Sequence, residues 1–189
     1  MKKLIVVMLV MSFLVFSGAA SAQNGGYMEV KIHSDSIGNF EVSKNSASVD
    51  EDVDVGITLS GEYKVPMDSQ WTLGGGIAYQ LERAIDEPGA ENFNFMPIYG
   101  IAQYNLVNSP SYLLGKLGFN TMNLDNLGSD ADENSGLYYA IGAGKSFGQN
   151  NEYVFEGLYS VNNGEIEENT GETFDVSYSK FTVSIGRKF

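Results

Sequence analysis

Two neighbouring segments of the chain alternate between apolar and polar residues. The first runs from Val53 to Val65 and the second from Trp71 to Leu81, with apolar residues or glycine at the odd positions. A period of two places successive side chains on opposite faces of a strand. Both segments are longer than the five or six residues usual for a soluble sheet, and only Pro66–Gln70 separates them. The pattern predicts two long antiparallel strands joined by a tight turn, as in a transmembrane hairpin.

Similar alternation recurs along the chain and predicts about eight strands. In the first strand we expect Met28, Val30 and Ile32 to face outward, and in the seventh we expect the same of Tyr153 to Val161 at every second position. The other six strands are expected at Val53–Val65, Trp71–Leu81, Phe93–Leu106, Tyr112–Asn123, Leu137–Phe147 and over the last residues up to Phe189.

Two strands have an ambiguous pattern. In Phe93–Leu106 we favour an outward row of Met96, Ile98, Gly100, Ala102, Tyr104 and Leu106, because it is longer than the opposing row of Phe95, Tyr99 and Ile101. In the last strand, Phe174, Val176 and Tyr178 lie on the parity opposite to Phe181. A β-bulge near Ser179 or Lys180 would bring the two apolar rows to one face.

The lengths of the connections alternate along the chain. Long connections are expected at Ser34–Asp52, Ala84–Asn92, Leu124–Gly136 and Asn162–Thr173, and short ones at Pro66–Gln70, Val107–Ser111 and Gly148–Glu152. This order is typical of extracellular loops and periplasmic turns. The sequence therefore predicts an all-β fold, an eight-stranded antiparallel up-and-down transmembrane β-barrel. The alternative is a soluble lipocalin-type barrel, which would place its apolar face inside. Aromatic residues beside the short turns and the terminal Phe189 favour an apolar exterior.

The N-terminus has the pattern of a secretory signal peptide. Lys2 and Lys3 precede an apolar run from Leu4 to Phe16, and Ala20-Ser21-Ala22 forms a small-residue cleavage site. We expect residues 1–22 to be the signal peptide and residues 23–189 to be one barrel domain, exported to the bacterial outer membrane. The chain has no cysteine, which excludes a lipoprotein anchor and a disulfide framework.

The charge of the chain is strongly negative. It carries 24 acidic and 11 basic residues, a net charge of −13, so nucleic acid is not an expected partner. The acidic residues gather in the long loops, where diffuse divalent cations are possible partners. The spacing Asp130-x-Asp132-x-Asn134-x-Gly136 resembles a calcium loop, but its glycine is one position late and Ile141 replaces the distal glutamate. We therefore assign no metal site and no cofactor.

Charged residues also recur on the inward parity of the expected strands. An eight-stranded barrel is just wide enough for side chains to fill, so these charges are expected to pair. Two interpretations remain open, a salt-bridged plug and a narrow path for ions. The single histidine, His33, suggests no catalytic site, because Ser34 beside it would point to the opposite face. The expected lumen charge network is Glu29, Lys31, Glu62, Lys64, Glu82, Lys116, Glu156 and Lys180.

The last residues resemble the terminal strand of bacterial outer-membrane barrels, which ends in an aromatic residue after alternating hydrophobics. Here these residues are Phe181, Val183, Ile185 and Phe189. The segment from Pro97-Ile98-Tyr99-Gly100 to Pro110-Ser111-Tyr112 resembles the central hairpin of the opacity-type and porin-like small β-barrel family, which includes barrels like outer membrane proteins A and X.

The resemblance implies an outer-membrane barrel whose terminal strand is read by the barrel-assembly machinery. Outer-membrane lipids and lipopolysaccharide would be its other partners. From the filled lumen and the acidic loops we expect an integral barrel with a structural or surface-interaction role and no catalysis. The alternative is a narrow porin-like channel for small ions.

Overall fold

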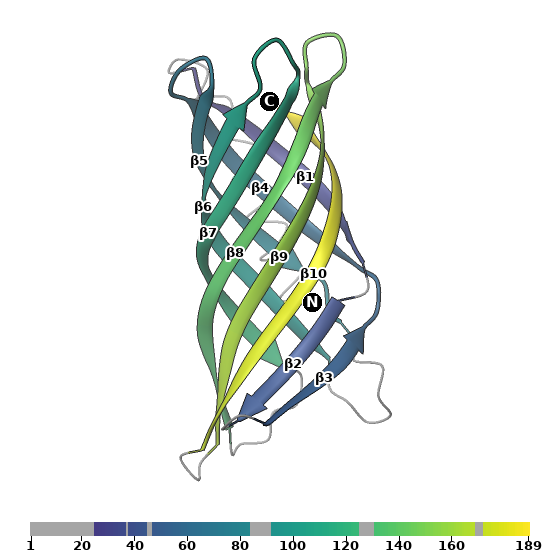
Figure 1. Cartoon of the computed structure of the whole chain (residues 1–189), viewed down its shortest axis with the longest axis vertical. Coiled ribbons are helices and arrows are strands. Elements are labelled where there is room, and N and C mark those ends of the chain that lie inside the picture. The colour runs from purple at the N-terminus through teal and green to yellow at the C-terminus, as the bar shows by residue number, and fades with distance from the viewer. Residues whose placement is uncertain (1–24, 37, 45–46, 84–91, 125–130, 169–171) are drawn as a thin grey trace.

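The protein is described by a computed structural model that covers residues 25–36, 38–44, 47–83, 92–124, 131–168 and 172–189 (Figure 1). The expected signal peptide lies outside these residues. No helix in the described segments is long and apolar enough to cross a membrane. The strands are β1 Tyr27–Asp35, β2 Gly38–Lys44, β3 Ala47–Val53, β4 Gly56–Pro66, β5 Trp71–Gln80, β6 Phe93–Asn105, β7 Ser111–Leu124, β8 Ala131–Phe147, β9 Tyr153–Glu168 and β10 Thr173–Lys188.

These ten segments form a closed antiparallel barrel of eight strands. The order β1-β4-β5-β6-β7-β8-β9-β10 closes because β1 also pairs with β10. β2 continues the path of β1 beside the same neighbouring strand, β10. The residues of β10 down to Thr182 pair with β1, and those from Ser179 onward toward Asp175 pair with β2. β3 likewise leads into β4. The predicted fold class is confirmed, and β1–β2 and β3–β4 are each one barrel strand with a short interruption.

The extracellular segments contain more strand than the sequence predicted. The expected loop Ser34–Asp52 includes the β2–β3 hairpin, and β9 and β10 remain paired out to Glu167 and Thr173. In Figure 1 the short turns and the C-terminus lie at the top of the upright barrel, and the β2–β3 hairpin lies toward the bottom. The sheet therefore extends well beyond the strand ends that apolar alternation marked.

The outer face of the barrel is apolar, as predicted. On β6 the favoured row is the outer one, with Ile98 61% exposed, whereas Tyr99 and Ile101 are buried inside. Phe119 and Ile141 are each 70% exposed on the same outer surface. Met28 and Val161 differ from the expectation, because both side chains are buried. The exposed apolar belt identifies the lipid-facing surface and excludes the lipocalin arrangement.

The predicted bulge in the last strand is wrong. β10 pairs with β9 without interruption from Thr173 to Arg187. Tyr178 and Val176 therefore share the inward face with Lys180, and both are buried in the lumen. The outward-facing residues change instead from apolar to polar: Phe181 is 54% exposed, and Ser179 is partly exposed. At this level the surroundings of the barrel change from lipid to water, so apolar residues belong inside.

The same change of solvent corrects the position of Val53. The sequence placed Val53 at the start of an outward row, but its side chain is fully buried inside the extracellular end of the barrel. β3 ends at Val53 and β4 begins at Gly56, and the outward row begins within this interruption at Val55, which is 64% exposed. The apolar layer of the extracellular half of the lumen consists of Phe40, Val53, Phe93, Phe95, Met122, Val176 and Tyr178.

Local hydrogen bonds and backbone conformation stabilise the short turns. Asp68 accepts hydrogen bonds from the backbone N–H groups of Gln70 and Trp71, at 2.7 and 2.6 Å. These bonds, the one from Trp71 first, lower the pKa of the exposed Asp68 carboxyl from its ordinary value. In the third turn Gly148 has a φ of +93°, which disfavours any residue with a Cβ. The turns thus need the Asp and Gly that the sequence provides.

Aromatic side chains gather beside these turns. Trp71 packs against Tyr104 at 5.1 Å between ring centroids, and Phe147 packs against Tyr153 at 5.5 Å. Tyr112, which also follows a short turn in the sequence, instead points into the lumen and is 2% exposed. The others form the girdle typical of a membrane interface.

Candidate lumen charge network

Six of the eight predicted lumen charges form one buried cluster in the half of the barrel nearest the short turns. β1 contributes Glu29 and Lys31, and β4 contributes Glu62 and Lys64 from positions directly alongside, since Glu29 pairs with Glu62. Lys116 from β7 and Glu156 from β9 reach the same point from across the barrel. Each of the six residues is at most 4% exposed.

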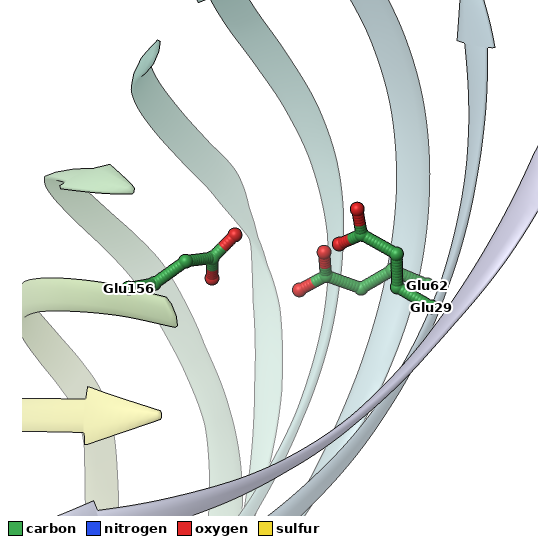
Figure 2. A group of neighbouring side chains, drawn as sticks. All are labelled: Glu29, Glu62 and Glu156. Atoms are coloured by element: carbon green, nitrogen blue, oxygen red, sulfur yellow. The ribbon is translucent and has the colours of Figure 1, made fainter. Parts of the chain in front are cut away.

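Lys31 is the centre of this cluster. Its ammonium nitrogen lies 2.7 Å from Glu62, 2.7 Å from Glu156 and 2.9 Å from Glu29. Figure 2 shows the three carboxyl groups converging from opposite walls of the barrel. These carboxylates belong to β1, to its neighbour β4 and to β9, so Lys31 links β1 to a strand from which β10 separates it in the sheet.

Two further lysines complete the cluster. Lys64 lies 2.7 Å from Glu29 and 3.2 Å from Glu62, and Lys116 lies 2.6 Å from Glu62. Three carboxylates thus face three ammonium groups. Such balance matters, because a buried charge without a partner is costly.

Neutral side chains supply additional hydrogen bonds. The Tyr99 hydroxyl donates to Glu62 at 3.0 Å and the Tyr112 hydroxyl donates to Glu156 at 2.8 Å. Gln103 accepts a 3.1 Å bond from Lys64. These three side chains are buried in the lumen together with the charged groups.

The three carboxylates also have the donor type of a cation site. Their oxygens lie within 4.8 Å of one another, and carboxylate oxygen is the ligand that calcium and magnesium prefer. Each carboxylate, however, already contacts a lysine ammonium group. A divalent cation would have to displace those ammonium groups, so the arrangement is an ion-pair network and not a metal centre.

A second, smaller cluster lies farther toward the extracellular end. Asp35 accepts hydrogen bonds from Lys180 at 2.7 Å, Thr182 at 2.8 Å and Thr58 at 2.6 Å, and it also contacts the Arg83 guanidinium. Lys180 therefore belongs here and not to the Lys31 cluster. Alternation along β1 could have identified Asp35, which lies two and four residues beyond His33 and Lys31 on the same parity.

The expected position of Glu82 is wrong. Its side chain is exposed, and Arg83 is buried in the lumen instead, at 3% exposure. β5 ends at Gln80, and Arg83 forms an isolated bridge with Phe93 on β6. The strict alternation that would have turned Glu82 inward ends with β5. No pattern in the sequence marks this interruption.

His33 contacts a serine, although not Ser34 beside it. Its Nε2 lies 2.7 Å from the Ser60 hydroxyl, the spacing of a nucleophile and its base. Both residues are buried, and the cavity that His33 lines has a volume of about 30 Å³. This volume holds one or two water molecules and not an acyl or glycosyl substrate.

The residues of the resembled terminal strand lie on the outer surface. Phe181, Val183, Ile185 and Phe189 are between 41% and 58% exposed. The site residues predicted from the sequence therefore lie on two faces of the barrel, the buried charges in the lumen and the terminal-strand residues on the outer surface. The calcium-like spacing is only partly described: Asp130 lies outside the described residues, and Asp132 and Asn134 fall within β8.

The sequence matches the family described as outer membrane protein beta-barrel domain over residues 5–189. The chain belongs to this family. Membership places this β-barrel protein in the bacterial outer membrane, as the apolar belt indicates. No curated protein matches the sequence.

Solved outer membrane barrels have the same fold. The attachment invasion locus protein Ail of Yersinia pestis is 15% identical with a TM-score of 0.54, and the match covers 87% of this chain and 99% of Ail. OprG from Pseudomonas aeruginosa is 15% identical with a TM-score of 0.54 and coverage of 87% and 96%. Neisserial surface protein A is 18% identical with a TM-score of 0.52 and coverage of 87% and 97%. At these identities, the likeness to the solved structures shows that this chain shares their barrel fold, and nothing more.

Proposed function

We propose that this barrel is a closed membrane anchor that presents its extracellular strand ends for surface interaction, without catalysis. The observation that supports this role most strongly is the network centred on Lys31, which joins β1, β4 and β9 across the lumen. The Asp35 cluster and the apolar layer around Phe93 lie in the lumen farther toward the cell exterior. An ion would have to break buried ion pairs and then cross this apolar layer.

Planar-bilayer conductance tests the closed lumen. After a heat-modifiable gel shift confirms folding, the native protein is expected to insert without discrete current steps. The double variant Lys116→Ala/Glu62→Ala removes one cation and one anion, so it widens the lumen without changing its net charge. Current steps in this variant but not in the native protein would support a plug. Steps in the native protein that the double variant alters would instead establish a channel. Lys44→Ala, outside the lumen, is the control.

A narrow channel remains the second candidate because of one observation. A cavity of about 30 Å³ lies in the lumen between Lys116 and Lys180. A cavity of this size with polar groups in its wall can hold water, so it is a possible segment of a path. The conductance measurement above decides between the two functions.

The proposed surface is the acidic extracellular end of the sheet. The β2–β3 hairpin carries Glu41, Asp50, Glu51 and Asp52, and the paired ends of β9 and β10 add further carboxylates. Lys44, which pairs with Glu172, is the one basic residue in the described parts of these strand ends. Ail has been solved in complex with the heparin analogue sucrose octasulfate. Here an acidic surface would repel such a polyanion, so a cationic partner fits better.

Binding to refolded protein in vesicles tests this surface. Oligolysine is expected to bind with an affinity that falls as salt rises, and heparin is expected not to bind. Asp50→Asn/Asp52→Asn should weaken oligolysine binding, whereas Glu152→Gln in a periplasmic turn should not. Preferred binding of heparin, or equal binding by the two variants, would refute the proposed partner class.

A further inference from the structure

The lumen contains a cavity between its two charged clusters. It has a volume of about 30 Å³ and is lined by Lys116 and His33 on the side of the Lys31 network and by Lys180 and Asp35 on the other. The rest of its wall combines polar side chains, among them Ser160 and Gln80, with apolar ones such as Pro97 and Leu158. The lining is therefore mixed, and its polar part carries charge of both signs.

The positive charges around this cavity outnumber the negative ones. In the Lys31 network three lysines balance three glutamates, but Asp35 alone faces both Lys180 and Arg83. Thr58 and Thr182 donate further hydrogen bonds to the same carboxylate, so its oxygens are already occupied by donors. The described buried residues thus carry one unbalanced positive charge beside the cavity. Burial of such a charge favours a compensating anion.

Two polar groups on the cavity wall have no protein partner among the described residues. The Ser160 hydroxyl is buried in a residue that is 3% exposed, and the side-chain oxygen assigned to Gln80 is buried in a residue that is 1% exposed. A hydroxyl can turn its proton toward an acceptor, and exchanging the oxygen and nitrogen of an amide presents N–H donors. Both groups can therefore donate to a ligand in the cavity.

We propose that this cavity binds one monatomic monovalent anion of the size of chloride. Lys180 supplies the charge, and Ser160 and Gln80 supply neutral donors. The volume admits an ion close to water in size but not sulfate or an organic acid. Asp35 compensates only one of its two cationic partners, Lys180 and Arg83, and the anion compensates the other. It also strengthens the packing between the two charged clusters.

Bromide replaces chloride and is visible by anomalous diffraction. Crystals of the refolded protein grown in sodium bromide are expected to show an anomalous peak in the cavity beside Lys180. Bromide peaks confined to the outer surface, with only water density in the cavity, would overturn the proposal.

Unfolding in urea provides the matching solution measurement. At constant ionic strength, replacing gluconate, which is too large for the cavity, by chloride is expected to raise the urea midpoint of the native protein. Lys180→Met should abolish this response, and Lys188→Met, which removes a lysine bonded to Ser146 away from the cavity, should retain it. If Lys180→Met fails to fold, Ser160→Ala leaves every charge in place and should weaken the response. An identical chloride response in all variants would also overturn the proposal.

Discussion

Removing the ammonium group of Lys31 should destabilise the barrel strongly. Lys31→Met keeps the length of the side chain, but it leaves three buried carboxylates facing only Lys64 and Lys116. Glu156 loses its 2.7 Å contact, and its distance to Lys64 is 3.7 Å. Breaking a buried ion pair by removal of one partner costs about 3–5 kcal/mol. Since Lys31 is fully buried and contacts three carboxylates, we expect a value in this range.

Equilibrium unfolding in urea measures this cost. Trp71 is the only tryptophan and is 47% exposed at the membrane interface, so its fluorescence reports transfer between lipid and water. The double variant Lys31→Met/Glu156→Gln removes one charge of each sign, and it should recover part of the lost stability. The coupling between the two substitutions gives the strength of the pair.

An exposed ion pair provides the control. Lys44 pairs with Glu172 at the extracellular end, where the two side chains are 31% and 52% exposed. Lys44→Met should cost at most about 1 kcal/mol. If Lys31→Met costs no more than Lys44→Met, or if Glu156→Gln adds its full penalty to that of Lys31→Met, the lumen network does not stabilise the fold.

Three further predictions concern packing, backbone approach and pH. Phe93→Ala, in the apolar layer, should lower the free energy of unfolding by about 3–5 kcal/mol, and an unchanged urea midpoint would contradict the layer. Gly118→Ala should fold poorly because its Cβ would lie 2.0 Å from the Ile98 carbonyl oxygen, whereas Gly115→Ala, with 4.0 Å to its nearest neighbour, should give a normal gel shift; equal folding yields would refute this. Asp68→Asn should lower the urea midpoint at neutral pH. Because the folded pKa of Asp68 is depressed, the stabilisation is present above its ordinary value of 3.8 and is lost as pH falls through the folded value, so a difference that persists in acid would contradict it.

Alternation along the sequence was sufficient to predict the barrel and the face of most side chains. A period of two fixes the face of every residue once a strand is recognised. For this reason the alternation alone places Lys31, Lys64 and Glu156 inside the barrel, where all three are buried. Alternation also predicted which row of β6 faces outward, because the longer of its two apolar rows is the one that contacts lipid.

Alternation predicted the wrong face for side chains in the part of the barrel that lipid does not surround. It assumes that apolar residues point to lipid, which holds only inside the membrane. Beyond the membrane, water surrounds the barrel, so Val176 and Tyr178 lie inward on β10, whose pairing with β9 continues. Val53 also lies inward, at the end of β3 and before the interruption that precedes β4. A local pattern contains no information on where the membrane ends, so the sequence predicts a loop where the β2–β3 hairpin lies and a bulge near Ser179 or Lys180, where β10 pairs with β9 without interruption.

The tertiary structure alone decided which inward charges meet. Lys31 and Glu156 are 125 positions apart, and their contact depends on the closure of the sheet and on the register of every strand between them. The exchange of Glu82 for Arg83 likewise depends on where β5 ends. Two clusters therefore replace the single network expected from sequence, and the separation between them creates the cavity. The physical reason is that alternation fixes the direction of a side chain, whereas height along the barrel and partners across it follow from the closed sheet.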